Sequence, residues 1–240
     1  MIDPGHLAYW AYQLMWSGLD WLFPTRCMGC GSSRSRLCNE CFAKIQPITG
    51  TVCQICGQPN PSMKLCVRCE ERKPVYSALR SWAPYSGTLR QAILKLKYRR
   101  DISLGEVLSR PLIELIKRLN WEVDIVVPVP VSLARFKERG YNQVSLIAFP
   151  LALGSGIPYR ARALSKIRDT RSQVGLAAEE RHKNVAQAFA ANPSIVKGRR
   201  VLVVDDITTT GATVEACAAE LSNAGASAVF GITLARSLLE

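Results

Sequence analysis

The sequence lacks the features that would carry a chain into or across a membrane. A secretory signal needs a basic start and an unbroken apolar segment, but the first residues include Asp3 and no basic segment. The apolar run that follows is interrupted by Gln13, Ser17 and Asp20. A membrane-spanning helix needs about 20 mostly apolar residues, so these interruptions argue against one. We therefore expect no signal peptide and no transmembrane segment.

Acidic residues are also scarce, with 19 against 31 lysines and arginines and a net charge of +12. The imbalance is concentrated in residues 71–200, where 24 basic and 10 acidic residues give a net charge of +14. Residues 1–70 have a net charge of +2, and residues 201–240 have a net charge of −4. This distribution favours polyanions, such as nucleic acids or polyphosphates, as ligands. A solvated basic surface is the alternative.

Cysteine is abundant, and eight of the nine cysteines form four C-x2-C pairs. Without a secretory signal, metal binding explains them better than disulfide bonds do, and the fourfold repetition argues against redox chemistry. Two pairs complete a tetrahedral zinc site with no open position, which indicates a structural role. The expected zinc ligands are Cys27, Cys30, Cys38, Cys41, Cys53, Cys56, Cys66 and Cys69.

The assignment of these cysteines to two zinc ions is open between two arrangements. We favour sequential use, in which the first four bind one ion and the last four bind the other, over an interleaved arrangement. Gly31 and Gly57 follow the first pair of each set, where a knuckle turn needs a small residue. The ninth cysteine, Cys217, stands alone on an apolar helix face and is expected in the core.

Residues 7–23, LAYWAYQLMWSGLDWLF, have the spacing of an amphipathic helix and contain three tryptophans. A helix packed on the rest of the protein is the favoured interpretation, ahead of a protein interface or a membrane surface. Further along, short strands are expected in residues 75–87 and helices in residues 88–101 and 103–119. Near the end of the first of these helices, Lys97 and Tyr98 stand among further cations, which suits contact with phosphate or nucleic acid as well as a solvated face.

An apolar run from Asp124 ends in Val129 and Pro130. Proline cannot continue a central ladder, so we expect a strand that stops here. A basic loop, LARFKERGYNQ, should follow, with a helix from Tyr141 onward. In a doubly wound sheet this loop lies at the carboxyl edge, where ligands bind, and its charge suits a diphosphate.

Residues 160–176 are rich in arginine and are expected to form a strand and then a loop from Asp169 to Gly175. A short helix follows, with a short strand as a further element before residue 192. His182 falls within that helix among charged residues, so a surface position is favoured over catalysis. Another buried strand is expected in ASAVFGITLAR, near residue 230.

The most informative stretch is VLVVDDITTTGAT, residues 201–213. Four apolar residues without alternation predict a strand buried on both faces. The Thr/Gly tail predicts a tight turn that opens a helix, and backbone N–H groups at a helix start favour phosphate. The paired acids Asp205 and Asp206 suit sugar hydroxyls or a magnesium ion. The stretch therefore predicts a phosphorylated sugar at the carboxyl end of a strand.

The same stretch resembles the signature of type I phosphoribosyltransferases, which bind 5-phosphoribosyl-1-pyrophosphate (PRPP). The whole series of motifs resembles the ComF family of bacterial proteins, which includes GntX relatives. That series comprises the double C-x2-C module, LKYRRD, VPVPVSLARFKERGYNQ, RDTRSQVGLAAEERHKNVAQAFA and VLVVDDITTTGAT, within residues 20–235.

The resemblance implies an α/β fold of the type I phosphoribosyltransferase class, with a twisted, mostly parallel sheet flanked by helices and a small hood. A four-cysteine zinc-ribbon module would precede it. The expected division is an N-terminal amphipathic helix in residues 1–26, a double zinc-binding module in residues 27–72 and a phosphoribosyltransferase-like domain in residues 75–240.

The resemblance also implies roles for individual residues. Asp205 and Asp206 would hold the ribose hydroxyls, directly or through Mg²⁺, and are the expected catalytic residues. Val129 and Pro130 would approach the pyrophosphate. The 5′-phosphate would be bound by Thr208, Thr209, Thr210, Gly211, Ala212 and Thr213. Further contacts with pyrophosphate or DNA are expected from Lys97, Arg139, Arg171 and Gln173. The family often has TPPQ where this chain has TRSQ at residues 170–173, which puts the geometry of Gln173 in doubt.

The implied setting is the cytoplasm, in natural competence and the use of imported DNA, with PRPP, single-stranded DNA and DNA-uptake proteins such as a ComF-operon helicase as partners. One hypothesis is a transferase that moves phosphoribosyl to an acceptor the sequence does not identify. The alternatives are a non-catalytic single-stranded DNA-binding protein with PRPP as effector, and a scaffold that docks through its N-terminal helix.

Overall fold

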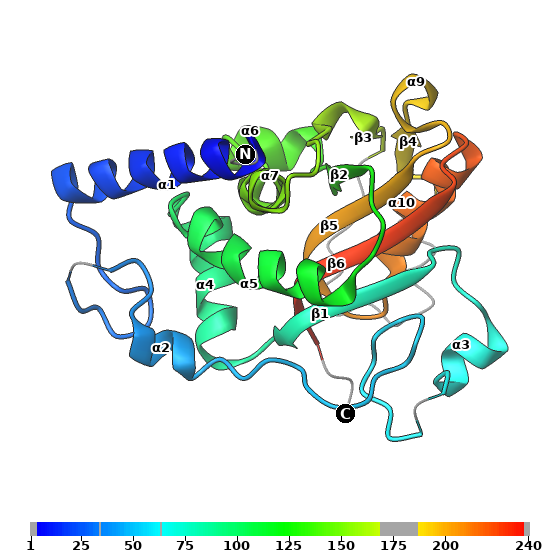
Figure 1. The fold of residues 1–240 in the computed structure, drawn as a ribbon, viewed down its shortest axis with the longest axis horizontal. Coiled ribbons are helices and arrows are strands. Elements are labelled where there is room, and N and C mark those ends of the chain that lie inside the picture. The colour runs from blue at the N-terminus through cyan, green and yellow to red at the C-terminus, as the bar shows by residue number, and fades with distance from the viewer. Residues whose placement is uncertain (1–3, 34, 63, 169–186, 238–240) are drawn as a thin grey trace.

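A computed structural model describes residues 4–33, 35–62, 64–168 and 187–237 (Figure 1). The helices of these residues are α1 (Pro4–Leu22), α2 (Asn39–Ala43), α3 (Val67–Glu71), α4 (Gly87–Tyr98), α5 (Leu104–Leu119), α6 (Leu133–Arg139), α7 (Gln143–Ser155), the 3-10 helix η1 (Ala161–Ala163), α9 (Pro193–Val196) and α10 (Ala212–Asn223). The strands are β1 (Ala78–Pro84), β2 (Ile125–Pro128), β3 (Leu164–Lys166), β4 (Phe189–Ala191), β5 (Arg200–Thr208) and β6 (Ala228–Arg236).

The main sheet has four parallel strands in the order β1-β6-β5-β2. Its central strands β5 and β6 are the two apolar runs of the C-terminal part, and their residues are buried on both faces as a parallel sheet requires. A small antiparallel pair, β3 with β4, stands beside this sheet. The mostly parallel sheet predicted from the sequence is therefore confirmed.

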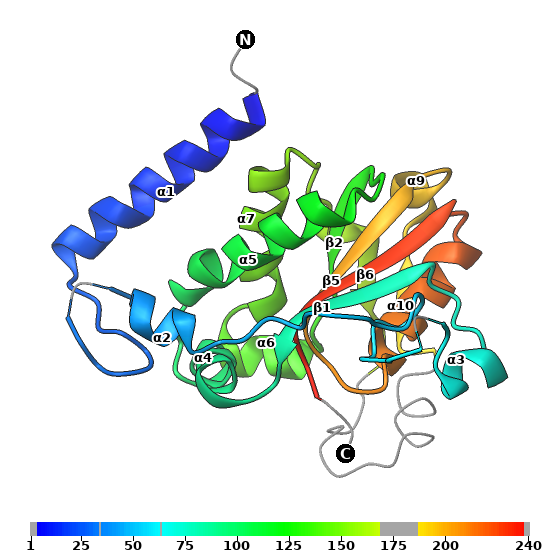
Figure 2. The same ribbon diagram turned by 60° about the horizontal axis from the view of Figure 1, so that its bottom comes forward.

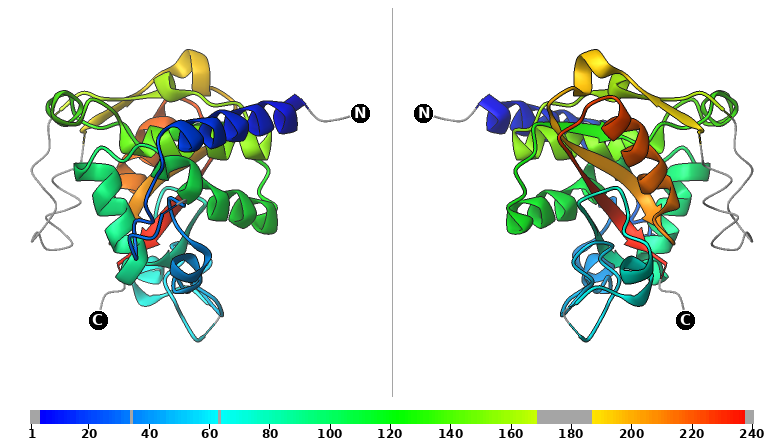
Figure 3. Two further views of the ribbon diagram at one scale, coloured as in Figure 1. Left: turned by 90° about the vertical axis from the view of Figure 1, so that its left-hand side faces the viewer. Right: turned by 90° about the vertical axis from the view of Figure 1, so that its right-hand side faces the viewer.

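Helices cover both faces of the sheet (Figures 1 and 3). On one face, Leu202 and Val204 of β5 pack in a cluster with apolar residues of α4, α5 and α7. On the other face, Val201 and Val203 pack in a second cluster with α10 and the β3–β4 pair. Cys217 of α10 is fully buried in this second cluster, which confirms its prediction as a core residue.

The cysteine module forms two zinc ribbons, which attach to different parts of the molecule (Figure 2). We call residues 27–41 ribbon 1 and residues 53–69 ribbon 2. The buried cysteines of ribbon 1 belong to the hydrophobic cluster of α4 and α5. Those of ribbon 2 belong to the cluster on the α10 face. Each ribbon thus adds to a different layer of the fold.

The predicted N-terminal helix is present as α1, but it is less closely packed than expected: Tyr12 and Trp16 are half-buried, whereas apolar residues such as Leu14 and Leu22 are exposed. Tyr12 meets Phe149 of α7 edge-on, with ring centroids 5.7 Å apart. Trp10 and Trp21 remain exposed on the outer side. None of the helices in the described ranges has the length and apolar character that crossing a membrane demands.

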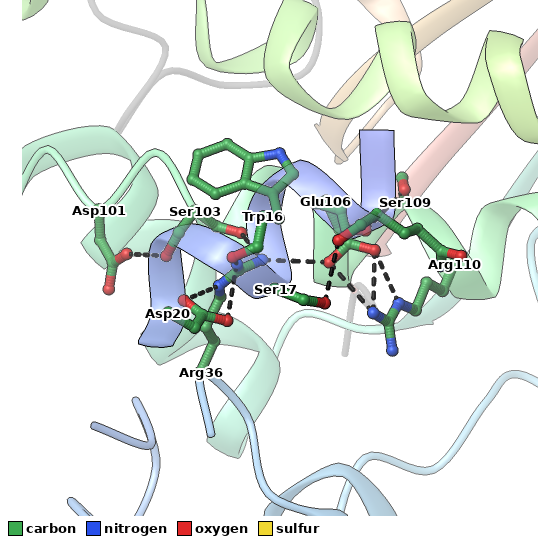
Figure 4. Close-up of polar contacts among 10 residues, drawn as sticks. Trp16, Ser17, Asp20, Arg36, Asp101, Ser103, Glu106, Ser109 and Arg110 are labelled. Atoms are coloured by element: carbon green, nitrogen blue, oxygen red, sulfur yellow. Dashed lines mark hydrogen bonds and ion pairs between the residues drawn. The ribbon is translucent and has the colours of Figure 1, made fainter. Parts of the chain in front are cut away.

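Arg36 of ribbon 1 ties α1 to α5 (Figure 4). Its guanidinium donates to Asp20 Oδ1 at 3.0 Å and to the carbonyl of Trp16 at 2.9 Å, both on α1. It also donates to Glu106 Oε2 on α5 at 3.2 Å and reaches the carbonyl of Ser103 at 3.4 Å. Arg36 and Glu106 are both buried, so their ion pair lies in the protein interior. Through its several contacts, Arg36 joins ribbon 1 to both α1 and α5.

Candidate functional site

The predicted site elements meet at the carboxyl edge of the main sheet. Strand β5 carries Asp205 and Asp206 close to its end. The neighbouring strand β2 ends at Pro128, which pairs with Val204, and the N–H of Val129 donates to the carbonyl of Val204 at 2.9 Å. The loop after β2 therefore starts beside the acid pair. This is the edge at which open α/β sheets bind ligands.

The two acids face opposite layers of the fold, because side chains alternate along a strand. Asp206 accepts a hydrogen bond from Lys97 Nζ of α4 at 2.9 Å and from Gln143 Nε2 of α7 at 2.8 Å. Asp205 lies toward α10, and its Oδ1 accepts from the N–H of Asp206 at 2.9 Å. Their exposed fractions are 8% for Asp205 and 4% for Asp206.

Burial and the neighbouring charge of Asp206 raise the pKa of Asp205 to about 7. Near neutral pH the neutral and the charged form of the Asp205 carboxyl group are therefore both populated. A ligand that brings a cation or hydroxyl donors would favour the charged form. Lys97 Nζ lies 2.9 Å from Asp206 Oδ1, so a cation already contacts the second acid.

A buried polar chain extends from Asp206. Arg139 Nη1, at the end of α6, donates to Gln143 Oε1 at 2.7 Å, and its guanidinium lies over the ring of Tyr98, 5.2 Å from the centroid. Lys97 and Arg139 were singled out from the sequence; Lys97 contacts Asp206 directly, and Arg139 reaches it only through Gln143. Gln143 is the last residue of the segment LARFKERGYNQ. It links Arg139 to Asp206.

The turn of residues 208–212, which we call the phosphate turn, joins β5 to α10 as predicted. Gly211 has φ of 84°, in the left-handed region, and serves as the N-cap of α10. The N–H of Ala212 donates to Thr210 Oγ1 at 3.4 Å. Thr208 Oγ1 is buried and has no hydrogen-bond partner among the described residues. The partial positive charge at the start of the 12-residue helix α10 makes this turn suited to an anion.

The segment after β2 differs from its prediction. Residues Leu133–Arg139 form helix α6 instead of a loop, because Ser132 caps its start and Gly140 ends it in a left-handed conformation. Helix α7 then starts at Gln143, two residues later than expected. Its N-cap Asn142 accepts from Val144 N–H at 2.9 Å and donates to the carbonyl of Val129 at 3.0 Å. Asn142 thus holds the Val129–Pro130 loop, a role the sequence did not reveal.

Two residues of the predicted site, Arg171 and Gln173, lie outside the described residues, as do His182 and the loop from Asp169 to Gly175. Their assigned roles remain predictions. Thr209 and Thr213 lie on either side of Gly211 at the start of α10.

The eight paired cysteines fall into two clusters, Cys27–Cys30–Cys38–Cys41 and Cys53–Cys56–Cys66–Cys69, with the sulfur atoms of each cluster within 4.8 Å of one another. This grouping confirms the sequential pairing.

The surroundings of the sulfur atoms fit zinc. Cys38 N–H donates to Cys27 Sγ at 3.3 Å, and Cys66 N–H donates to Cys53 Sγ at 3.4 Å. Burial raises the pKa of Cys27 and Cys53, but these backbone N–H groups and others outweigh it and bring both pKa values to about 6. Four cysteine sulfur atoms within reach of one ion are the ligand set of structural zinc.

Comparison with known proteins places this arrangement in a family. The sequence matches the double zinc ribbon domain over residues 18–70 and the phosphoribosyl transferase domain over residues 110–237. It is 31% identical over 228 residues to the DNA utilization protein YhgH of Salmonella typhi, covering 92% of this chain and 98% of that protein. It is 28% identical over 210 residues to the competence protein ComFC of Bacillus subtilis, covering 84% and 85%. The chain belongs to the ComF family.

This ComF-family chain therefore combines a double zinc ribbon with the type I phosphoribosyltransferase fold, as the sequence predicted. Among solved structures it matches a glutamine PRPP amidotransferase from B. subtilis complexed with ADP and GMP, with a TM-score of 0.42 and 23% identity. The match covers 59% of this chain and 30% of that one.

Proposed function

We propose that this protein binds PRPP with Mg²⁺ at the carboxyl edge of its sheet and binds single-stranded DNA beside it, in the cytoplasmic handling of imported DNA. The observation that carries the proposal is the convergence of three elements at one edge. The buried acid pair, the phosphate turn and the Val129–Pro130 loop come from separate parts of the chain, and each suits one part of PRPP.

In this proposal the phosphate turn binds the 5′-phosphate through the N–H groups at the start of α10 and the hydroxyl of Thr208, which has no partner among the described residues. Asp205 and Asp206 hold the ribose hydroxyls. The Val129–Pro130 loop receives the diphosphate, and Lys97, whose Nζ lies 2.9 Å from Asp206 Oδ1, supplies a cation beside the acids.

Magnesium fits the donor set, because carboxylate and phosphate oxygens are its preferred ligands. Asp205 and Asp206 would hold the ion, which would supply positive charge against the charge of the leaving diphosphate. Both oxygens of Asp206 are already hydrogen-bonded, one to Lys97 and one to Gln143. Asp205 is therefore the better candidate for contact with the magnesium ion or with a ribose hydroxyl of PRPP.

The end of α4 supports the DNA component. Tyr98 is 61% exposed, and Arg99 and Arg100 beside it are also exposed. An aromatic ring among cations offers a stacking surface for bases and contacts for the backbone. Because Lys97 on the same helix reaches Asp206, this patch adjoins the proposed PRPP site. The relatives named for DNA utilization and competence provide the setting.

The proposed binding admits a further step, in which the phosphoribosyl group is transferred to an acceptor with release of pyrophosphate. The acceptor is unidentified, and the alternative is a non-catalytic DNA-binding or scaffold protein that uses PRPP as an effector.

Calorimetry with PRPP and Mg²⁺ tests the proposal directly. Wild type should bind, and Asp205→Asn/Asp206→Asn should lose most of the affinity, while Glu114→Gln on the exposed side of α5 should bind as wild type does. Equal affinity in wild type and the double variant would show that PRPP does not use the acid pair. Titration of labelled single-stranded DNA at low and high salt, with and without PRPP, tests the second ligand, because phosphate contacts weaken as salt rises.

A further inference from the structure

Ribbon 2 is packed directly on the strand that borders the main sheet. The N–H of Leu79 in β1 donates to the carbonyl of Ile55 at 2.7 Å. A Cβ on Gly57 would overlap the carbonyl oxygen of Leu79. Arg80, next along β1, donates to the carbonyl of Gln54 at 3.0 Å. The loop that holds the first thiol pair of ribbon 2 is thus fixed to β1 backbone against backbone.

Arg236 joins the same loop to the phosphate turn. This residue, 1% exposed, ends β6 and donates to the carbonyl of Cys56 and, at 3.3 Å, to Gln58 Oε1. It is also the strand partner of Thr208, where the phosphate turn begins. The next residue, Ser237, donates its N–H to the carbonyl of Thr208 at 2.9 Å. One buried arginine therefore lies between a zinc ligand's carbonyl and the turn.

Tyr76 makes a second connection. It is buried in the hydrophobic cluster that contains Cys53, Cys56 and Ala212. Its hydroxyl oxygen lies 3.0 Å from the position of a Cβ on Gly211, so it packs against the residue that caps α10. This hydroxyl has no hydrogen-bond partner among the described residues. Tyr76 therefore supports the turn by packing.

Ribbon 1 is attached elsewhere, to α1, α4 and α5. Its main-chain carbonyl at Met28 accepts from Lys95 of α4 at 3.0 Å. Its Arg36 contacts α1 and α5, and its thiols belong to the opposite hydrophobic cluster. The two ribbons thus offer an internal comparison.

We propose that ribbon 2, through Arg236 and Tyr76, sets the geometry of the phosphate turn, so that zinc in ribbon 2 and a sugar phosphate in the turn strengthen each other's binding while ribbon 1 stays uncoupled. Arg236 is then a positioning residue for the 5′-phosphate. This inference rests on the proposed function, because it takes the turn as the phosphate site. Coupling between two binding sites is reciprocal, so each ligand should reveal it in the other.

Ribose 5-phosphate is the probe, because it carries the phosphate and ribose without needing Mg²⁺. Zinc release from the full chain to a chromogenic chelator should be slower for one of the two ions when ribose 5-phosphate is present, by roughly the fivefold or more that site coupling produces. Cys38→Ser and Cys66→Ser assign the ions. These are matched third cysteines, whose N–H groups donate to the first thiol of their own clusters.

The reverse measurement is the affinity for ribose 5-phosphate by calorimetry. Cys66→Ser should weaken it by about fivefold or more, and Cys38→Ser should leave it near the wild-type value. Arg236→Gln, which keeps all eight thiols, should weaken binding with both zinc ions still present, and Arg236→Lys should recover part of the affinity.

The outcomes separate the two proposals. If wild type does not bind ribose 5-phosphate, the phosphate site and this inference both fall. If wild type binds but zinc release from ribbon 2 is unchanged, or both ribbons respond equally, only the inference falls. If Cys66→Ser or Arg236→Gln does not fold, Cys38→Ser still assigns the ions, because the ion that it retains is that of ribbon 2, and the release assay on wild type then decides.

Discussion

The two zinc ribbons have the same C-x2-C spacing pattern and the same N–H to sulfur bonds, yet they attach to the fold in different ways. Ribbon 1 is attached by charge, through Arg36 and its ion pairs with Asp20 and Glu106. Ribbon 2 is attached by backbone contact, with Arg80 and Arg236 donating to its carbonyls. The two ribbons are similar in sequence but differ in the elements that they contact. Each can therefore influence only the part of the fold on which it packs.

The acid pair extends this comparison to the two layers of the fold. Asp206 points toward the helices on the ribbon 1 side and finds Lys97 and Gln143 there. Asp205 points toward α10, on the ribbon 2 side, where burial raises its pKa. The site thus has one acid that contacts a lysine and one acid that accepts a hydrogen bond from the backbone.

The largest effect should come from Arg36→Met, which would sharpen the contrast in attachment. It removes the charge that pairs with buried Glu106, and removing one partner of a buried ion pair costs about 3–5 kcal/mol. Glu106 keeps Arg110 at 2.9 Å, but that arginine is largely exposed, so we expect a value near the lower end. Thermal unfolding of the zinc-loaded protein measures it. A loss below about 1 kcal/mol would show that ribbon 1 does not depend on this charge.

A second test uses the equivalent glycines of the two ribbons. Gly31 and Gly57 have φ of 78° and 70°, so alanine at either position costs roughly 1–2 kcal/mol of backbone strain. A Cβ at Gly31 meets nothing within 4 Å, whereas at Gly57 it would overlap the Leu79 carbonyl. Gly57→Ala should therefore cost about 1–3 kcal/mol more than Gly31→Ala, the usual range for overpacking. Denaturant unfolding compares them, and equal losses would contradict direct packing of ribbon 2 on β1.

A third test separates the two acids by pH, without Mg²⁺ or ligand. The pKa of Asp205 is raised in the folded state, to about 7, so its contribution to stability is present at acidic pH and is lost as the pH rises through that value. Asp205→Asn should therefore gain stability relative to wild type as the pH rises from the ordinary carboxyl pKa of 3.8 to about 7, by roughly 1 kcal/mol per pH unit, and the gain should stay level at higher pH. Asp206→Asn should lose stability instead, because it leaves Lys97 without its carboxylate.

Melting temperatures of wild type and both variants at acidic and alkaline pH provide the measurement. If the two variants changed in the same direction at alkaline pH, the acids would not differ as their surroundings indicate.

Much of this arrangement could be predicted from local sequence. The strand, acid pair and turn of residues 201–213 are contiguous, and so are the C-x2-C pairs, so each pattern contains its own chemistry. The contacts of Arg36, Gln143 and Arg236 could not be predicted, because each joins segments far apart in the chain and depends on tertiary packing. Helix α6 was missed although Ser132 and Gly140 carried its start and stop signals, because its basic residues suggested a ligand-binding loop.

The smallest effect should come from an exposed ion pair just beyond ribbon 2. It tests whether charge contributes to the attachment of this ribbon. Arg72, just after α3, lies 3.7 Å from Glu215 on α10, and its side chain is mostly exposed. Exposed ion pairs contribute about 0–1 kcal/mol, so Arg72→Ala should change the unfolding free energy by less than 1 kcal/mol and should leave zinc release from ribbon 2 unchanged. A larger loss of unfolding free energy in Arg72→Ala, or an equal loss in wild type at high salt, would mean that this exposed ion pair holds ribbon 2 in place. Both ribbons would then be attached through ion pairs, and only the location of those pairs would differ.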